Sequence, residues 1–333
     1  MIGKISAAVF ARIAYVRLAS LLETAGAPLP VKIVIYVLCF ASVVLFCMWK
    51  WQESLLYMPA VPNPQAPMGA KLHKLAQNPP GLRSPAEQDL RYEDVTLTAS
   101  DGVKLSAWFI PAGNPAAPTI IFAHENAGNM GLRLQEFKVL HDHVGCHVLC
   151  YDYRGYGDSD EAPINEEGLM ADALAAWRWL AEKDEPRVDR SRIFLYGRSL
   201  GGAVTIQLAR LLCEEAAASA GGASSALLPA GVLVGNTFTS ISEMLGSVYP
   251  FLNFGLIRRH LLRLQWRSIE HIRHVRVPIS FMVGTDDELV PPAHTEVKTG
   301  LTYLPAYLPL TYLLELLTYG PRARVSCAYR GEA

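Results

Sequence analysis

Short apolar runs alternate along the middle of this chain with longer stretches in which apolar positions recur every three or four residues. Uninterrupted apolar runs favour buried strands, and the longer recurrence favours amphipathic helices. The strand-like runs are residues 119–123, 147–151, 192–196, 231–234 and 278–283, and the helix-like stretches are residues 132–141, 166–182 and 202–212. Strands that alternate with helices predict a mostly parallel, doubly wound α/β sheet.

A different pattern precedes this region. Residues 91–98 alternate polar and apolar positions, residues 100–102 read Ser-Asp-Gly, and residues 104–110 form a second β-favouring run. Alternation on both sides of a tight turn is typical of a hairpin. We therefore expect an antiparallel hairpin to open the sheet.

The longest apolar run lies near the beginning of the chain. Residues 33–49 carry no charge and stand between Lys32 and Lys50. Seventeen uncharged residues reach the lower limit for a membrane-spanning helix. The sequence predicts a basic segment over residues 1–30 and a transmembrane anchor over residues 31–51, in a single-pass protein of the endomembrane system or plasma membrane. The side of the membrane stays open, and a mitochondrial presequence is an alternative interpretation of the first 22 residues.

Composition and charge add to this outline. The 30 Lys and Arg residues balance 31 Asp and Glu residues, so nothing indicates a nucleic-acid partner, and 51% hydrophobic residues agree with a lipid bilayer as partner. Prolines crowd the segment after the anchor, which predicts an extended connector over residues 52–84. A globular domain over residues 85–293 and an atypical tail over residues 294–333 complete the expected organisation.

The most informative motif is Gly-Arg-Ser-Leu-Gly at residues 197–201. It fits the pattern G-x-S-x-G and stands between an expected strand and an expected helix. A serine at such a turn has a strained backbone and an exposed hydroxyl, and the glycines are needed because neighbouring elements pack too close for Cβ atoms. Ser199 is therefore the candidate nucleophile.

An acyl-transfer serine also needs two backbone N–H groups that bind the oxyanion. The amide of Leu200 is one candidate, and the loop after residues 119–123 supplies the other. We expect the second donor to be Asn126, with Glu125 as the less favoured choice. A free carboxylate at Glu125 opposes an oxyanion unless it points away or carries a proton.

A catalytic acid is expected after a late strand, because the order in this architecture is Ser, then Asp or Glu, then His. Asp286 and Asp287 follow the last strand-like run, and Asp287 is the preferred candidate. His141, His143 and His147 are only a poor indication of a metal site, so we expect neither a metal nor a cofactor.

Eight short strings together carry a family resemblance. They are residues 55–59, 92–95, 100–103, 125–129, 153–157, 197–204, 236–241 and 287–292. In this order they resemble the bud-emergence-type α/β hydrolases, which include the alpha/beta-hydrolase-domain-13 proteins and the plant wavy-growth-2 protein. The plant-like branch is the most similar, because Glu rather than Gly precedes its Asn-Ala-Gly-Asn string. The resemblance implies an α/β-hydrolase fold and a membrane-anchored serine hydrolase of esters or thioesters, including palmitoylated proteins.

The general base is the missing part of this expectation. In the family it lies in a Gly-x-His segment one helix and one strand after the acid, and this chain has no such segment. His294 follows Asp287 by only seven residues and is a poor substitute. We therefore expect an α/β-hydrolase fold that is incomplete at its C-terminus, where the family sequence is replaced. A catalytically idle, membrane-tethered binding or regulatory protein is the alternative function.

Overall fold

The structure is a computed structural model of the chain. It describes residues 28–63, 69–182, 187–219, 227–248 and 262–282, together with a few single positions between Val16 and Gly26. The chain divides into two compact units, residues 1–52 and residues 53–333.

Helix α2 (Leu29–Lys50) is the main described element of the first unit. It contains an 18-residue window with a mean hydropathy of 2.5, and none of its side chains is buried in the protein. A helix of this length extends about 33 Å, which is enough to cross the hydrocarbon core of a bilayer. Pro30 in its first turn and Lys50 in its last turn suit the two ends of a helix. Within the described part of the chain, α2 is thus the one helix long and apolar enough to span a membrane, and it covers the predicted anchor, residues 31–51, except for Trp51.

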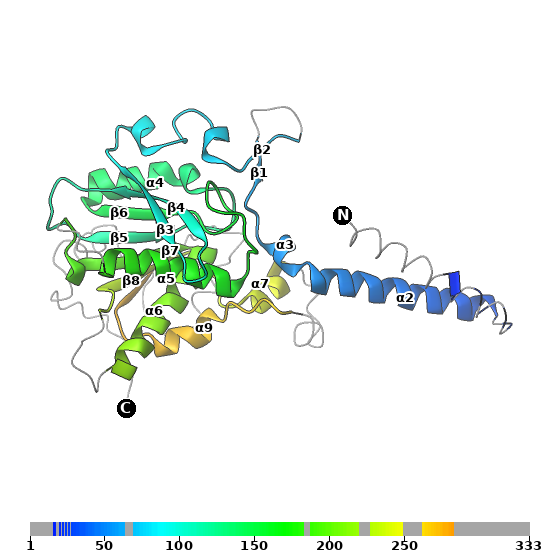
Figure 1. Cartoon of the computed structure of the whole chain (residues 1–333). Helices are drawn as coiled ribbons and strands as arrows, with labels where there is room; N and C mark the ends of the chain where they lie inside the picture. Colours follow the sequence, from blue (N-terminus) through cyan, green and yellow to red (C-terminus); the bar gives the residue numbers. More distant parts are fainter. Residues whose placement is uncertain are drawn as a thin grey trace. The chain divides into compact units, whose positions relative to one another are not determined.

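A seven-stranded sheet organises the second unit (Figure 1). In spatial order its strands are β3 (Glu93–Thr98), β4 (Lys104–Ile110), β6 (His147–Tyr151), β5 (Thr119–Ala123), β7 (Ile193–Arg198), β8 (Gly231–Gly235) and β9 (Ile279–Met282). The pairs β3–β4 and β4–β6 are antiparallel, and all later neighbours are parallel. Ala123 of β5 pairs with Tyr151 of β6 and with Gly197 of β7, so these strands end at one edge. This arrangement confirms the mostly parallel sheet with an antiparallel opening hairpin.

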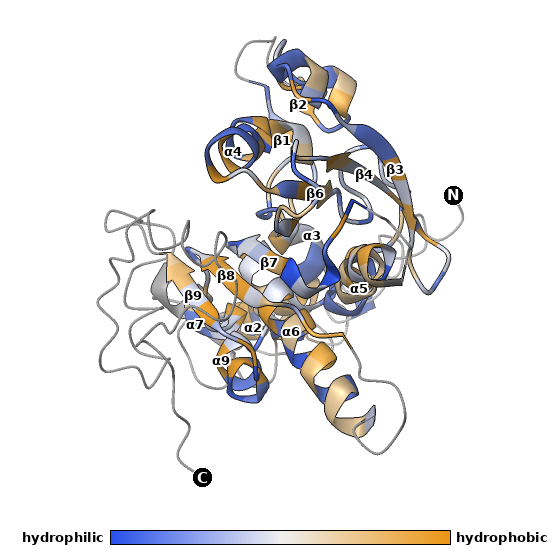
Figure 2. Ribbon diagram, turned by 90° about the vertical axis from the view of Figure 1, so that its left-hand side faces the viewer, coloured by the Kyte–Doolittle hydropathy of each residue, from blue (hydrophilic) through white to orange (hydrophobic). Residues whose placement is uncertain are grey.

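Helices cover both faces of the sheet. Helix α4 (Leu134–Val139) lies on one face, and α5 (Glu166–Glu182) and α6 (Leu200–Ser219) lie on the other (Figures 1 and 2). Ile121 of β5 packs in the apolar cluster that includes α5 and α6, whereas its neighbour Phe122 packs in the cluster that includes α4. The central strands are therefore buried on both faces, which explains their continuous apolar runs. Among the described residues, four short helices lie between the later strands. They are η5 (Arg190–Arg192), α7 (Ile241–Val248), α9 (Ser268–His271) and η7 (Ile272–His274).

The helix predicted over residues 132–141 is longer and less regular in the structure than expected. It is built from η3 (Met130–Arg133), α4 and a wider π-type turn, η4 (Leu140–Val144). Gly145 ends the helix with φ +72°, and its N–H donates to the Leu140 carbonyl. The helix continues to this point because Gly145 is the first residue that adopts the left-handed conformation without strain.

Residues 52–84 also differ from the extended connector expected for them. They form α3 (Gln52–Leu56), the two-stranded ribbon β1 (Val61–Pro62) and β2 (Lys71–Leu72), and the 3₁₀ turn η1 (Leu75–Gln77); η2 (Pro85–Gln88) follows. Tyr57, Leu72 and Leu75 are buried. These apolar side chains are buried within the second unit, so this part of the segment belongs to the folded body rather than to a free linker.

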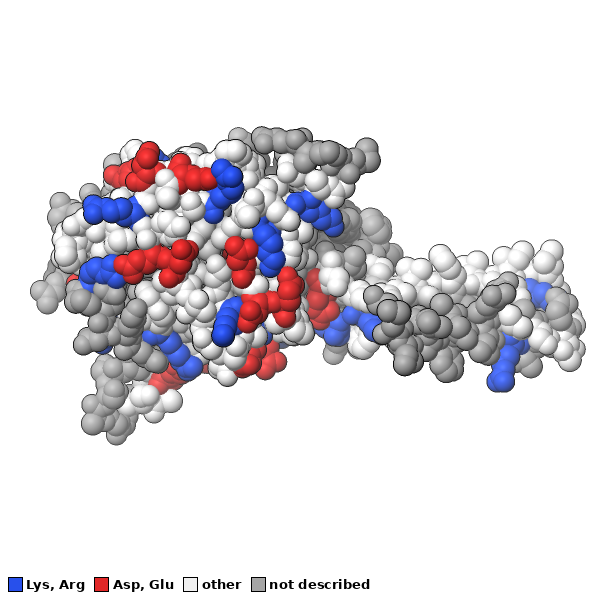
Figure 3. Space-filling model, turned by 45° about the horizontal axis from the view of Figure 1, so that its top comes forward, with Lys and Arg blue, Asp and Glu red and all other residues white. Residues whose placement is uncertain are grey.

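Charged side chains of both signs are interspersed over the part of the second unit visible in Figure 3. No continuous field of one sign covers that face. The distribution agrees with the near balance of 30 basic and 31 acidic residues in the sequence.

Candidate active site

Ser199 occupies a sharp turn between β7 and α6. Its backbone has φ +52°, in the left-handed region that side chains other than glycine rarely adopt. The Ser199 N–H donates to the Gly235 carbonyl at 2.9 Å, and its own carbonyl accepts from the Gly202 N–H at 3.0 Å and from Thr237 Oγ1 at 2.8 Å. Because these bonds fix the backbone, the strained turn is held in place at the sheet edge where the parallel strands end.

The glycines around Ser199 are required for the steric reason that the motif predicts. A Cβ atom on Gly197 would lie 2.0 Å from the Gly201 carbonyl oxygen, and a Cβ atom on Gly201 would lie 1.9 Å from the Ala123 carbonyl oxygen. A Cβ atom on Gly202 would lie 2.7 Å from Cβ of Thr237. All three positions exclude a side chain, so that α6 starts directly against β5 and β8.

The two predicted oxyanion donors are the backbone N–H groups of Leu200 and Asn126. Leu200 is the first residue of α6, and such an amide has no partner within its own helix. Asn126 lies in the loop after β5. The start of this loop lies close to the residues that follow Ser199, since a Cβ atom on Gly201 would be 2.8 Å from the His124 carbonyl oxygen. Among the described residues, neither amide donates a hydrogen bond to another group. The structure thus brings the predicted donors to the same edge as the predicted nucleophile.

Glu125 stands beside the second donor, and its carboxylate has a cationic partner. Its Oε2 lies 2.7 Å from Nε of Arg133, and Arg198 is a more distant partner at 3.9 Å. Burial raises the pKa of Glu125, but the charge of Arg133 and the hydrogen bonds to the carboxylate together outweigh it, so that the pKa is lowered overall. The carboxylate therefore stays ionised and is neutralised by Arg133, which removes the objection that a bare charge would oppose an oxyanion.

A buried histidine and aspartate lie beneath the same loop. His124 Nε2 is 3.5 Å from Oδ1 of Asp152, and both side chains are fully buried. Burial, followed by the charge of Arg133, lowers the pKa of His124 to about 4. Burial raises the pKa of Asp152 to about 7, although the Met130 N–H donates to this carboxylate. His124 is thus neutral at pH 7 and enclosed by protein, which suits support of the loop better than proton transfer at the surface.

The predicted acid and the histidine considered as a substitute base lie outside the described residues. Asp287, its alternative Asp286 and His294 all follow β9, whose last residue is Met282. The Met282 carbonyl accepts from the Asn236 N–H, so the carboxyl end of β9 lies beside the carboxyl end of β8. Asp287 stays the predicted acid with Asp286 as its alternative, His294 stays a poor substitute for the base, and the base itself stays unassigned.

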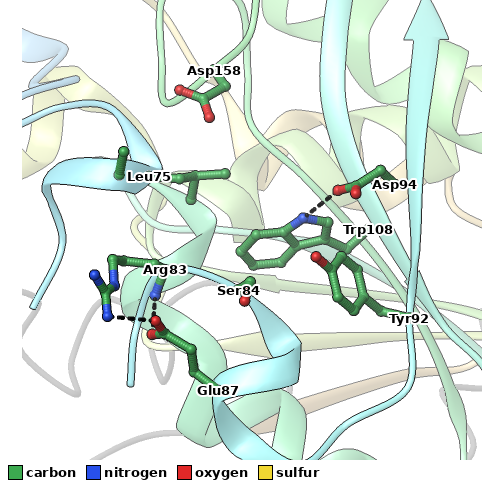
Figure 4. A pocket seen from close by; sticks show the side chains of 9 residues that line it. Leu75, Arg83, Ser84, Glu87, Tyr92, Asp94, Trp108 and Asp158 are labelled. Atoms are coloured by element: carbon green, nitrogen blue, oxygen red, sulfur yellow. Dashed lines mark hydrogen bonds and ion pairs between the residues drawn. The ribbon is translucent and has the colours of Figure 1, made fainter. Parts of the chain in front are cut away.

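A recess of about 480 Å³ is separate from this edge (Figure 4). It lies between the segment that precedes β3 and the strands β3 and β4, with Trp108 and Tyr92 on one side and the Arg83–Glu87 ion pair on the other. Strands β6 and β5 lie between β4 and β7, the strand that ends directly before Ser199. The recess is therefore not the candidate active site. Within the described residues, no three His, Cys, Asp or Glu side chains are placed to hold a metal ion.

Two contributions to this site were missed by the sequence reasoning. Arg133 holds the loop through Glu125 and through a 2.6 Å hydrogen bond to the Ala127 carbonyl. The Asn126 side chain bonds to the segment that follows α2, 70 positions earlier in the chain. The only sequence signal was that residues 55–59 and 125–129 both belong to the family strings.

Comparison with known sequences defines the class of protein. The model described as the alpha/beta hydrolase family matches residues 120–326. The match covers more than half of the chain and includes the turn at Ser199. The chain belongs to the alpha/beta hydrolase family.

Individual relatives narrow this class. The chain is 34% identical over 257 residues to the alpha/beta hydrolase domain-containing protein WAV2 of Arabidopsis thaliana, covering 74% of each chain. It is 31% identical over 304 residues to protein bem46 of Schizosaccharomyces pombe, covering 90% of this chain and 86% of that protein. It is also 28% identical over 244 residues to the lysophosphatidylserine lipase ABHD12 of Danio rerio, covering 63% of this chain and 59% of that protein. The first two confirm the resemblance to the bud-emergence-type hydrolases.

Solved structures agree on the fold. An alpha-beta hydrolase from Vibrio vulnificus superposes with a TM-score of 0.52 at 20% identity, covering 65% of this chain and 71% of that chain. An esterase from Pyrococcus furiosus superposes with a TM-score of 0.50 at 19% identity, covering 65% and 79% respectively. At this identity the likeness concerns the fold alone.

Proposed function

We propose that this protein is a membrane-anchored serine hydrolase that cleaves an ester or thioester through Ser199. The observation that carries the proposal is the left-handed backbone of Ser199 at the end of β7, with φ +52° and close-packed glycines on both sides. A non-glycine residue keeps such a conformation only where the surrounding structure enforces it, and strain of this kind gathers at functional sites.

The chemistry follows from the groups at this edge. The Ser199 hydroxyl oxygen attacks the acyl carbonyl carbon while a general base takes its proton, and the carbonyl oxygen becomes an oxyanion. The N–H groups of Leu200 and Asn126 bind that oxyanion, and the positive end of α6 adds to the stabilisation. The alcohol or thiol then leaves, and water hydrolyses the acyl-enzyme. We assign the acid to Asp287 and leave the base unassigned among the residues that follow it.

The proposed substrate is a long-chain acyl ester or thioester presented at a membrane. Two observations support this class. Helix α2 is long and apolar enough to anchor the chain in a bilayer, and one relative bears the name of a lysophosphatidylserine lipase. A lysophospholipid and a palmitoylated protein both belong to this class. We propose that it is a single-pass membrane protein of the endomembrane system or plasma membrane.

A second candidate function has its own support. The sequence after Asp287 contains His294 as its only histidine and no Gly-x-His segment. A serine hydrolase without its base retains only residual catalysis. The second candidate is therefore a catalytically idle, membrane-tethered binding protein that keeps the acyl site.

Hydrolysis by the full chain separates the two candidates. Purified protein in detergent micelles is assayed with acyl esters and acyl thioesters of increasing chain length, beside Ser199→Ala. The serine hydrolase predicts turnover that Ser199→Ala lacks. Turnover no faster than that of Ser199→Ala on every substrate would contradict it and favour the idle protein.

A further inference from the structure

The segment directly after α3 runs beside the oxyanion loop. We call residues 56–58 the strap and residues 126–128 the oxyanion loop. Met58 and Ala127 pair as a parallel β-bridge, and the Gly128 N–H donates to the Met58 carbonyl at 3.1 Å. Only six positions separate the strap's first residue, Leu56, from Lys50, the end of the candidate membrane span. The strap therefore follows the candidate membrane span closely in the sequence.

The Asn126 side chain joins the two segments. Its Nδ2 donates to the Leu56 carbonyl at 2.5 Å, and its Oδ1 accepts from the Met58 N–H at 3.2 Å. These partners define the orientation of the amide, because a carbonyl needs a donor and an N–H needs an acceptor. The carboxamide thus makes the two hydrogen bonds that a peptide group of a neighbouring parallel strand would make. Its partners, Leu56 and Met58, are the residues directly before and after Tyr57.

Two buried tyrosines support this pairing. Tyr156, which is fully buried, donates its hydroxyl hydrogen to Asn126 Oδ1 at 2.9 Å. Tyr57 of the strap is 4% exposed, and its hydroxyl oxygen accepts from Nε1 of Trp266 at 3.1 Å. Burial raises the pKa of both phenols, so that both remain neutral. The strap is therefore anchored in the body of the unit and gives Asn126 a fixed support.

The oxyanion loop is held on its other side by Arg133. Its guanidinium donates to the Ala127 carbonyl at 2.6 Å and pairs with Glu125. An N–H group stabilises an oxyanion well only where it already points at the position of the charge. A loop held from two sides meets this requirement, whereas a loop held on one side can rotate its amide away.

We propose that the strap is a positioning element of the active site, and that the Asn126 carboxamide is the positioning group through which it orients the Asn126 N–H. This inference rests on the proposed hydrolase function. It gives the residues that follow the membrane anchor a direct part in setting the catalytic geometry. It also gives Asn126 two separable roles, because its N–H belongs to the backbone and survives every substitution except proline.

The test uses the full chain in detergent micelles and two readouts. The first is hydrogen–deuterium exchange at the Gly128 amide, which reports the strap contact without any need for activity. The second is the rate constant for labelling by a fluorophosphonate, compared with kcat and KM for an acyl ester. Asn126→Ala removes the carboxamide, and Tyr156→Phe removes one of its partners. The matched control is Asn114→Ala, at an exposed asparagine in the turn between β4 and β5.

In Asn126→Ala we expect exchange at Gly128 to accelerate about tenfold or more. The labelling rate and kcat should fall about 10- to 100-fold at nearly constant KM, because a misplaced donor costs transition-state binding rather than substrate binding. Tyr156→Phe should show smaller changes in the same direction, and Asn114→Ala should show none.

Unchanged exchange at Gly128 in both Asn126→Ala and Tyr156→Phe would overturn the strap contact. Faster exchange with an unchanged labelling rate would overturn its positioning role. A wild type that neither labels nor turns over would instead overturn the proposed function, while the exchange measurement would still decide whether the strap holds the loop.

Discussion

The strained backbone of Ser199 allows a test of stability with two substitutions at one position. At φ +52° an L-residue is about 1–2 kcal/mol less stable than in the right-handed region, and glycine is almost unaffected. Ser199→Ala removes the hydroxyl and keeps the strain, whereas Ser199→Gly removes both. Glycine also gives the unfolded chain more freedom, which offsets about 0.5–1 kcal/mol of the gain. We expect Ser199→Gly to have the larger free energy of unfolding by about 0.5–1 kcal/mol.

Thermal unfolding of the full chain in detergent micelles measures this difference. For a domain of this size class, 1 kcal/mol corresponds to roughly 2–4 °C in Tm, so Ser199→Gly should unfold roughly 1–4 °C above Ser199→Ala. Ser191 is the matched control, because it lies in η5 (Arg190–Arg192), where the backbone has negative φ. There the order should reverse, with Ala at least as stable as Gly.

The reasoning is refuted if Ala is as stable as Gly, or more so, at position 199. That result would mean that the Ser199 backbone does not adopt the left-handed conformation. The main structural support for Ser199 as the nucleophile would then be removed.

Three further predictions concern the surroundings of Ser199. Gly201→Ala should destabilise the protein by about 3 kcal/mol or more and abolish labelling, because its Cβ would lie 1.9 Å from a backbone oxygen of β5. Arg133→Met should lower the labelling rate about tenfold or more, because the partly buried carboxylate of Glu125 loses its counter-charge beside the oxyanion. Asp152→Asn should flatten the dependence of Tm on pH. In the folded state Asp152 keeps its proton up to about pH 7, against an ordinary pKa of 3.8, so the free energy of unfolding falls as pH rises through this range. Between pH 6 and pH 8 the Asp152 contribution to the free energy of unfolding falls by about 1.4 kcal/mol.

Matched variants decide each of these cases. Gly113→Ala, at a glycine with open space around it and no positive φ, should be nearly neutral, and an equal loss at both glycines would contradict the steric argument. Adding Glu125→Gln to Arg133→Met should restore part of the labelling rate, since no unpaired charge remains; no recovery would argue against the charge effect. Asp89→Asn, at an exposed aspartate, should keep the slope of Tm against pH. If Asp152→Asn has the same slope of Tm against pH as the wild type, Asp152 is not the source of the pH dependence.

The architecture was predictable because its central strands are buried on both faces. Residues 119–123 and 147–151 appear in the sequence as continuous apolar runs, and both match β5 and β6 in full. Residues 166–182 match α5 because one face of this helix packs on the sheet, which gives a helical recurrence of apolar positions. The strain at Ser199 was predictable for another reason, since glycines on both sides of a serine between strand and helix leave few other conformations.

The support of the oxyanion loop was not predictable, because it depends on contacts between distant parts of the chain. The Asn126 carboxamide bonds to Leu56, 70 positions away, and Trp266 donates to Tyr57 across 209 positions. Periodicity reports only which face of an element is buried and gives no information on such pairs. The prolines of residues 52–84 favoured an extended connector, and isolated apolar residues such as Leu72 carry no period that would reveal their burial.

The most direct test of the central claim is to locate a fluorophosphonate adduct on the full chain by peptide mass spectrometry. The account predicts one covalent adduct on the peptide that contains Ser199, formed at a measurable rate and absent from Ser199→Ala. An adduct on a different residue, or none on the wild type in a preparation whose Gly128 amide is protected from exchange, would contradict the assignment of Ser199 as the nucleophile.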